Sequence, residues 1–161
     1  MEDTLATKTF FTEEVPVLLA GLQTNSRPAW GTMNAIEMLA HLEAGLRISM
    51  EDVERPIMIP VDKIDRYQAF LRSDKSFPAG SPKPQEYAAY ELQFESLEAA
   101  RLQLLKTVED FLHFWRDQPH FTSVHPHFGR LDQIHWLHLH RKHFRHHFVQ
   151  FGLMEAPELP A

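Results

Sequence analysis

The sequence predicts an all-α fold built from four main helices, and three observations favour it. Apolar residues recur at helical spacing in long stretches before residue 50 and after residue 94, and capping residues stand where these stretches begin. No run of residues alternates between apolar and polar in the manner of a strand. The length of 161 residues, with 43% hydrophobic and 24% charged, is typical of one globular domain, here residues 1–161.

The first two helices are predicted in the N-terminal third of the chain. The first is expected to begin after Thr12 and to end before Asn25, with Pro16 in its first turn, where a missing N–H is tolerated. The second begins at Asn34, whose side chain can cap it, and Glu37 completes a capping box. The apolar residues that then recur at helical spacing are Leu39, Leu42 and Leu46.

Residues 51–90 are predicted to form an irregular connection between helices 2 and 3. A short helix from Lys63 to Leu71 is expected to interrupt it. A connection this long argues against a simple up-down bundle with tight loops. Its prolines are Pro56, Pro60, Pro78, Pro82 and Pro84.

The last two helices are predicted in the C-terminal half. A long helix from Phe94 to Trp115 carries a continuous apolar stripe without glycine or proline. After a loop through residues 125–129, Asp132 can cap a final helix that continues to Phe151 and stops at Gly152. The sequence thus predicts a four-helix bundle with one long connection.

The composition excludes several kinds of protein. The net charge is −6 and the basic residues are scattered, which argues against a nucleic-acid partner. No segment approaches the ~20 apolar residues of a membrane span, and the acidic N-terminus shows no signal peptide, so a cytoplasmic protein is expected. The absence of cysteine excludes disulfides, thiolate ligands and a thiol nucleophile. Any metal site must therefore use His, Asp or Glu.

The histidines indicate such a metal site. The chain has eleven, most of them between His125 and His147. His143 and His147 lie four residues apart on the predicted last helix, so both imidazoles project from one face and can bind one divalent cation. A third ligand would have to come from another helix, and His41 is the best candidate. The alternative is that these histidines are hydrogen-bonded core or surface residues.

Four further residues are candidates for a second shell or a pocket. On a helical wheel, Trp136, His140 and Gln150 share the stripe of His143 and His147. His140 is a candidate ligand or second-shell group, and Gln150 can orient a bound water or ligand, or hydrogen-bond a neighbouring helix. One turn before His41, Glu37 can act as a second-shell acceptor or a base, although the capping box gives it a structural role.

Four blocks of the sequence carry a resemblance to a known family, and they are Trp30–Asn34, Met38–His41, His125–Leu131 and His143–Gly152. They resemble the DinB-like (damage-inducible) superfamily, in a branch without an assigned function. The resemblance implies an antiparallel four-helix bundle with a long connection between helices 2 and 3. It also implies a divalent metal bound by His41, His143 and His147, and a homodimer. Some members catalyse transfers that involve low-molecular-weight thiols.

These observations lead to a metal-dependent enzyme as the first hypothesis. Three imidazoles with open positions for water are typical of catalytic zinc sites, whereas structural sites are normally closed by four protein ligands. The expected activity is a thiol-dependent transferase or a hydrolase with a small-molecule substrate. Zinc or nickel is the expected metal, and iron or manganese is also compatible. The alternative is a non-catalytic metal-binding stress or binding module with a structural ion.

Overall fold

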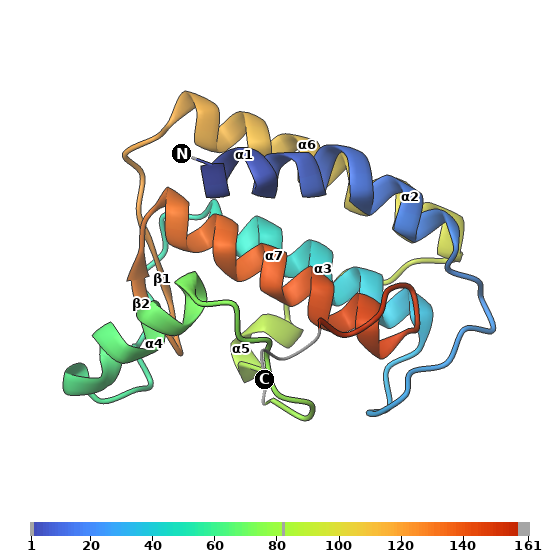
Figure 1. Cartoon of the computed structure of the whole chain (residues 1–161), viewed down its shortest axis with the longest axis horizontal. Coiled ribbons are helices and arrows are strands. Elements are labelled where there is room, and N and C mark those ends of the chain that lie inside the picture. The colour runs from blue at the N-terminus through green and yellow to red at the C-terminus, as the bar shows by residue number, and fades with distance from the viewer. Residues whose placement is uncertain (1, 82, 158–161) are drawn as a thin grey trace.

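Long helices lying side by side form the body of the protein (Figure 1). The computed structural model describes residues 2–81 and 83–157. An N-terminal helical rod is followed by three long helices, and α3 packs against both α6 and α7 while α1 packs against α7. These elements are α1 (Glu2–Thr9), a π-helical segment (Phe10–Glu14), α2 (Val15–Ala20), α3 (Ala35–Ser49), α6 (Leu97–Asp117) and α7 (Gln133–Gln150).

The connection between α3 and α6 lies on the side of α3 and α7 that faces away from the N-terminal rod and α6 (Figure 1). It contains a 3₁₀ turn (Val61–Lys63), α4 (Ile64–Arg72) and α5 (Gln85–Ala88). Gln68 of α4 donates hydrogen bonds to the carbonyls of Phe128 and Arg130, which fixes the connection to the segment before α7. The connection therefore covers one face of the helices α3 and α7.

The prediction of an all-α four-helix bundle is wrong, because the structure also contains a small antiparallel sheet. Strands β1 (Ser123–His125) and β2 (Gly129–Leu131) pair with His125 opposite Gly129. Each strand has only three residues, too few to leave an alternating pattern in the sequence. Gly129 adopts a φ of 78°, a conformation that favours glycine, where the turn ends. Helix α5, within the connection, was not predicted either.

The N-terminal helix begins earlier than predicted. It was expected after Thr12, yet α1 already begins at Glu2. A π-helical segment ends at Glu14, two residues before Pro16, and the N–H of Val15 donates to the carbonyl of Phe10, five residues back. Because proline lacks an N–H, a helix that continues past it must rearrange its hydrogen bonds, and the π turn does so here.

The predicted helix caps are confirmed. Asn34 accepts a hydrogen bond from the N–H of Glu37 at 2.8 Å, and the Glu37 carboxylate accepts one from the N–H of Asn34 at 3.1 Å. Asp132 caps α7 by accepting from the N–H of His135 at 3.0 Å. Helix α6 is capped by Ser96, so it begins slightly later than expected. These local interactions fix the residues at which α3 and α7 start, and hence how far along each helix its histidines lie.

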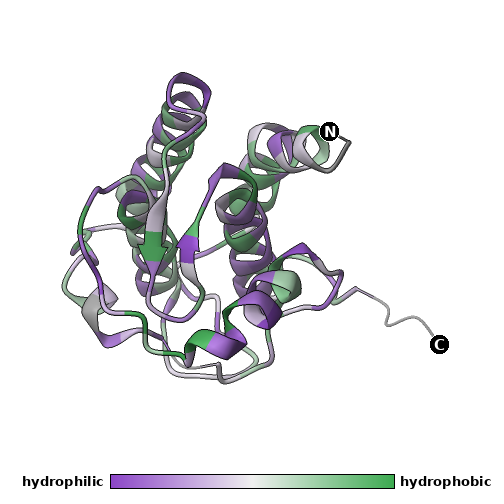
Figure 2. Ribbon diagram, turned by 90° about the vertical axis from the view of Figure 1, so that its left-hand side faces the viewer, coloured by the Kyte–Doolittle hydropathy of each residue, from purple (hydrophilic) through white to green (hydrophobic). Residues whose placement is uncertain are grey.

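A single apolar cluster fills the space between the helices, whose apolar and polar residues are distinguished in Figure 2. Its largest fully buried side chains include five from α6 and α7, namely Phe111, Trp115, Trp136, Phe144 and Phe148. Within the described residues, no helix has the length and apolar character that crossing a membrane requires.

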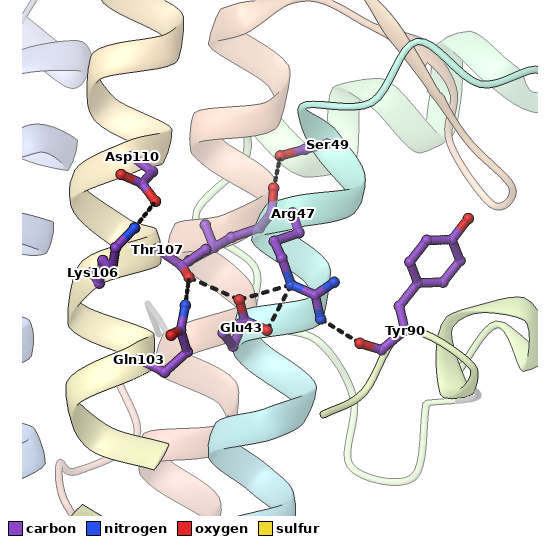
Figure 3. Close-up of polar contacts among 9 residues, drawn as sticks. Glu43, Arg47, Ser49, Tyr90, Gln103, Lys106, Thr107 and Asp110 are labelled. Carbon is purple, nitrogen blue, oxygen red and sulfur yellow. Dashed lines mark hydrogen bonds and ion pairs between the residues drawn. The ribbon is translucent and has the colours of Figure 1, made fainter. Parts of the chain in front are cut away.

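A polar network joins α3 to α6 inside this packing (Figure 3). Glu43 is fully buried, and both of its carboxylate oxygens accept hydrogen bonds from Nε of Arg47 at 2.8 Å. The hydroxyl of Thr107 on α6 donates to Glu43 at 2.8 Å and accepts from Gln103 at 3.1 Å. Arg47 also donates to the carbonyl of Tyr90. The network thus ties α6 and the residues just before α6 to the middle of α3.

Candidate metal centre

Three histidine side chains converge between α3 and α7. His41 projects from α3, while His143 and His147 project from one face of α7, one turn apart. The Nε2 atom of His143 lies 2.8 Å from that of His41 and 3.1 Å from that of His147. The three residues form a group that could hold a metal ion, and no other His, Asp or Glu of the described residues belongs to it.

The spacing of the nitrogens suits a small divalent cation. Two imidazole nitrogens that bind one tetrahedral zinc ion at 2.0–2.1 Å lie about 3.3 Å apart. The observed separations of 2.8 and 3.1 Å are slightly shorter, so a small rotation of the rings would admit an ion. The ring of His143 lies against α3 beside Gly45, one turn after His41, at a distance where even a Cβ would make only ordinary van der Waals contact. The residues present therefore fit a metal.

A carboxylate fixes the orientation of His41. Nδ1 of His41 lies 3.1 Å from Oε1 of Glu91, and the same oxygen accepts from Nζ of Lys83 at 2.6 Å. Burial raises the pKa of Glu91, but the hydrogen bonds and charges of His41 and Lys83 outweigh it and lower that pKa overall. An ionised carboxylate only accepts, so Nδ1 of His41 carries the proton and Nε2 keeps its lone pair for a metal.

An amide fixes His147 in the same way. Nε2 of Gln150 donates to the backbone carbonyl of Trp30 at 2.9 Å, which turns the amide oxygen of Gln150 toward Nδ1 of His147 at 2.6 Å. Since the oxygen only accepts, Nδ1 of His147 is the protonated nitrogen and Nε2 faces the other histidines as a base. His41 and His147 are therefore both held in the tautomer that binds metal through Nε2.

The α7 histidines are held neutral. Burial, reinforced by the neighbouring His41, lowers the pKa of His147 to about 3. Burial, together with His41 and His147, also holds the pKa of His143 well below its usual range. Imidazoles bind metal only in the neutral form, so no proton competes for these nitrogens near pH 7.

The cluster lies in the wall of a large pocket. Its volume is about 980 Å³, and the residues that line it come from α3, α7, the connection and the turn between β1 and β2. All three histidines of the cluster line this pocket. The nitrogens are thus in reach of a small molecule that enters between the connection and α7.

The other predicted site residues fall into three positions. Gln150 contacts His147, as described above. His140 and Trp136 line the same pocket but lie outside the cluster; their rings stack at 5.3 Å, and Nε2 of His140 lies 3.0 Å from the hydroxyl of Ser49. Burial lowers the pKa of His140 to about 3. Glu37 belongs to the capping box.

Sequence reasoning missed Glu91 as the partner of His41. Glu91 lies in an irregular segment after α5, where no periodic pattern shows which way a side chain points. It reaches His41 because the residue before it, Tyr90, is held by Arg47. Only the tertiary structure brings these residues together.

Replacing Glu91 with alanine is expected to weaken metal binding about ten- to a hundredfold, because His41 would lose the acceptor that fixes its ring. The measurement is a zinc titration against a competing chelator. Glu95 is exposed and makes no ion pair with the described residues, so Glu95→Ala removes the same charge as a matched control and should leave the affinity unchanged. An equal loss of affinity in both variants would show that Glu91 acts only through overall charge.

The comparison with protein families identifies the chain. Residues 12–154 match the model of a family described as a protein of unknown function, DUF1569. The chain belongs to the DUF1569 family. No curated protein and no solved structure matches it significantly. His41, His143 and His147 all lie inside the part that matches the DUF1569 model.

Membership of DUF1569 corrects the expected DinB-like assignment, which is wrong because the matching model is that of a different family. Two of the four blocks that suggested it, Met38–His41 and His143–Gly152, contain the three histidines of the cluster. Histidines at helical spacing follow from the geometry of binding a metal on helices, so unrelated helical proteins can share them.

Proposed function

We propose that this DUF1569 protein is a metal-dependent enzyme that acts on a small molecule bound in its pocket. The observation that carries the proposal is the convergence of three Nε2 atoms in the wall of a pocket of about 980 Å³. A group of three imidazoles leaves coordination positions for water or substrate, which is typical of catalytic sites.

The residues around the cluster support this proposal through their effect on two of the three rings. Glu91 and Gln150 hold His41 and His147 in fixed orientations, so little reorganisation is needed when an ion or substrate binds. A divalent ion at this position would supply Lewis-acid chemistry and lower the pKa of a bound water or thiol. The chain has no cysteine, so a thiol would have to come from a second substrate. The reaction we propose is hydrolysis or transfer to such a thiol.

The second candidate is a non-catalytic binding module with a structural ion. It is favoured by one observation, namely that His41 and the other two histidines come from different helices, so an ion would cross-link α3 to α7. This candidate predicts the same metal content as the enzyme. It differs in expecting that no coordination position at the metal is open to water, thiol or another added ligand.

The experiment is to load the protein with Co²⁺ and add 2-mercaptoethanol while recording the absorption spectrum. If the metal has an open position that faces the pocket, the thiol sulfur binds it and a thiolate-to-cobalt band appears in the near ultraviolet. The His143→Ala variant, treated identically, serves as the control for cobalt bound elsewhere. A cobalt site that binds stoichiometrically but does not change on addition of thiol or azide would contradict the catalytic proposal and favour the structural ion.

A further inference from the structure

The charged residues of α4 and the preceding turn are sorted by face. Lys63 and Arg66, three residues apart, both line the pocket. Asp62 and Asp65 precede them in sequence with the same spacing but do not line it. Side chains three apart on a helix share a face, and adjacent ones point about 100° apart. The cations of this segment are therefore turned toward the pocket and the carboxylates away from it.

The same charge pattern continues around the pocket. Lys75 also lines it, while Asp74 beside it does not. The side chains of Lys63, Arg66 and Lys75 are exposed and make no ion pair within the described part of the chain. Lys83 is the fourth lining cation, but its charge is matched by Glu91. No aspartate or glutamate among the described side chains lines the pocket, although the protein carries a net charge of −6. Lys63, Arg66 and Lys75, which we call the rim cations, thus have no ion-pair partner among the described residues.

The wall between this rim and the histidine cluster is largely aromatic. Phe77 lies near the middle, with its ring centroid 6.3 Å from that of Phe128 and 6.5 Å from that of His143. Phe70 packs against Phe77 at 5.4 Å and lines the pocket as well. Apolar walls of this kind accept aromatic or aliphatic parts of a ligand and give little hydrogen bonding. A ligand along this wall would have a polar group at one end, near the exposed cations, and its reacting group at the other end, near the histidines.

We propose that the pocket binds an amphiphilic organic anion, with its carboxylate, phosphate or sulfonate group at Lys63, Arg66 and Lys75 and its apolar body against Phe70, Phe77 and Phe128. This inference rests on the proposed function for its reacting end, because the end of the ligand remote from the anion reaches His41, His143 and His147. The binding itself requires only the pocket. The substrate class is therefore defined by a negative group and an apolar body on one molecule.

The test uses two fluorescent probes of the same shape. One is 8-anilinonaphthalene-1-sulfonate, and the other is N-phenyl-1-naphthylamine, which lacks the sulfonate. Each is titrated into the metal-loaded protein and into the Lys63→Gln/Arg66→Gln/Lys75→Gln variant. We expect the variant to bind the sulfonate probe at least about tenfold more weakly, because three rim cations each contribute a modest attraction. Its affinity for the neutral probe should not change.

A matched variant controls for overall charge. Lys8→Gln/Lys106→Gln/Arg116→Gln removes three exposed cations that do not line the pocket, and it should bind both probes like the unaltered protein. Equal sulfonate affinity in all three proteins, or equal weakening in both variants, would overturn the proposal. Metal content is measured in parallel. If the protein binds the sulfonate probe selectively but binds no metal, the proposed ligand class holds and the metal-dependent enzyme is refuted. If it binds metal but does not distinguish the two probes, the proposed ligand class is refuted and the metal site is not.

Discussion

The His143→Ala and His147→Ala variants are each expected to lose stoichiometric metal binding. Each change removes one of only three nitrogens in the group, and two imidazoles bind a divalent ion far more weakly than three. We expect the affinity for zinc to fall at least about a hundredfold. The measurement is elemental analysis of untagged protein after dialysis, combined with a competitive chelator titration.

The control for this prediction is His146→Ala. His146 is next to His147, with the ring centroids 4.9 Å apart, but it lies outside the metal group and its Nδ1 is 3.2 Å from the carbonyl of Phe77. It removes a histidine from the same helix without removing a ligand. His143 is only partly buried, so its variant should keep the helicity of the parent protein in circular dichroism. Full metal content in folded His143→Ala would refute the three-histidine site.

Replacing Glu43 with alanine is expected to cause the largest loss of stability among the variants considered. The change leaves Arg47 and the buried hydroxyl of Thr107 without their acceptor and opens a cavity between α3 and α6 (Figure 3). Glu43 is fully buried but the Arg47 side chain is 29% exposed and keeps some water, so the lost ion pair, the unpaired Thr107 hydroxyl and the cavity together cost about 3 kcal/mol. For a protein of this size, that corresponds to a fall in Tm of roughly 6–12 °C. Thermal unfolding followed by circular dichroism measures it.

The matched control is a variant of another ion pair that Figure 3 shows. Lys106 and Asp110 are also four residues apart and lie 3.0 Å from each other, but both side chains are more than half exposed. An exposed pair contributes less than about 1 kcal/mol, so Asp110→Ala should change Tm little. The Glu43→Gln variant keeps the size of the side chain and an acceptor for Thr107, and should fall between the two. Similar losses for Glu43→Ala and Asp110→Ala would mean that the buried network contributes no special stability.

Features set by local sequence were predicted well. The capping box of Asn34 and Glu37 and the Asp132 cap depend on residues three positions apart, and the structure contains both. Helical periodicity also predicted that His143 and His147 share a face, because the period of 3.6 residues alone determines it. The structure then brings both to His41. Which reaction these histidines support is not encoded in such spacing, so it enters only as a proposal.

Features set by long-range contacts were not predictable. Glu91 meets His41 across fifty residues, and Thr107 meets Glu43 across 64. The three-residue strands are too short to show a pattern, and Pro16 looked like the start of a helix because its π turn depends on hydrogen bonds rather than on residue types. Sequence periodicity describes one element at a time, whereas these features depend on how elements meet.

The pocket is assembled from two kinds of chain segment with separate tasks. The three converging nitrogens belong to α3 and α7, whereas the rim cations and the ring of Phe77 belong to the connection. Lys142 on α7 holds the connection by donating to the carbonyls of Ser73 and Lys75. Exchanging Lys63, Arg66, Lys75 or Phe77 would alter which molecules are admitted and leave in place Glu91, the residue of the connection that orients His41. That division makes this scaffold suitable for re-engineering selectivity by varying a single stretch of about thirty residues.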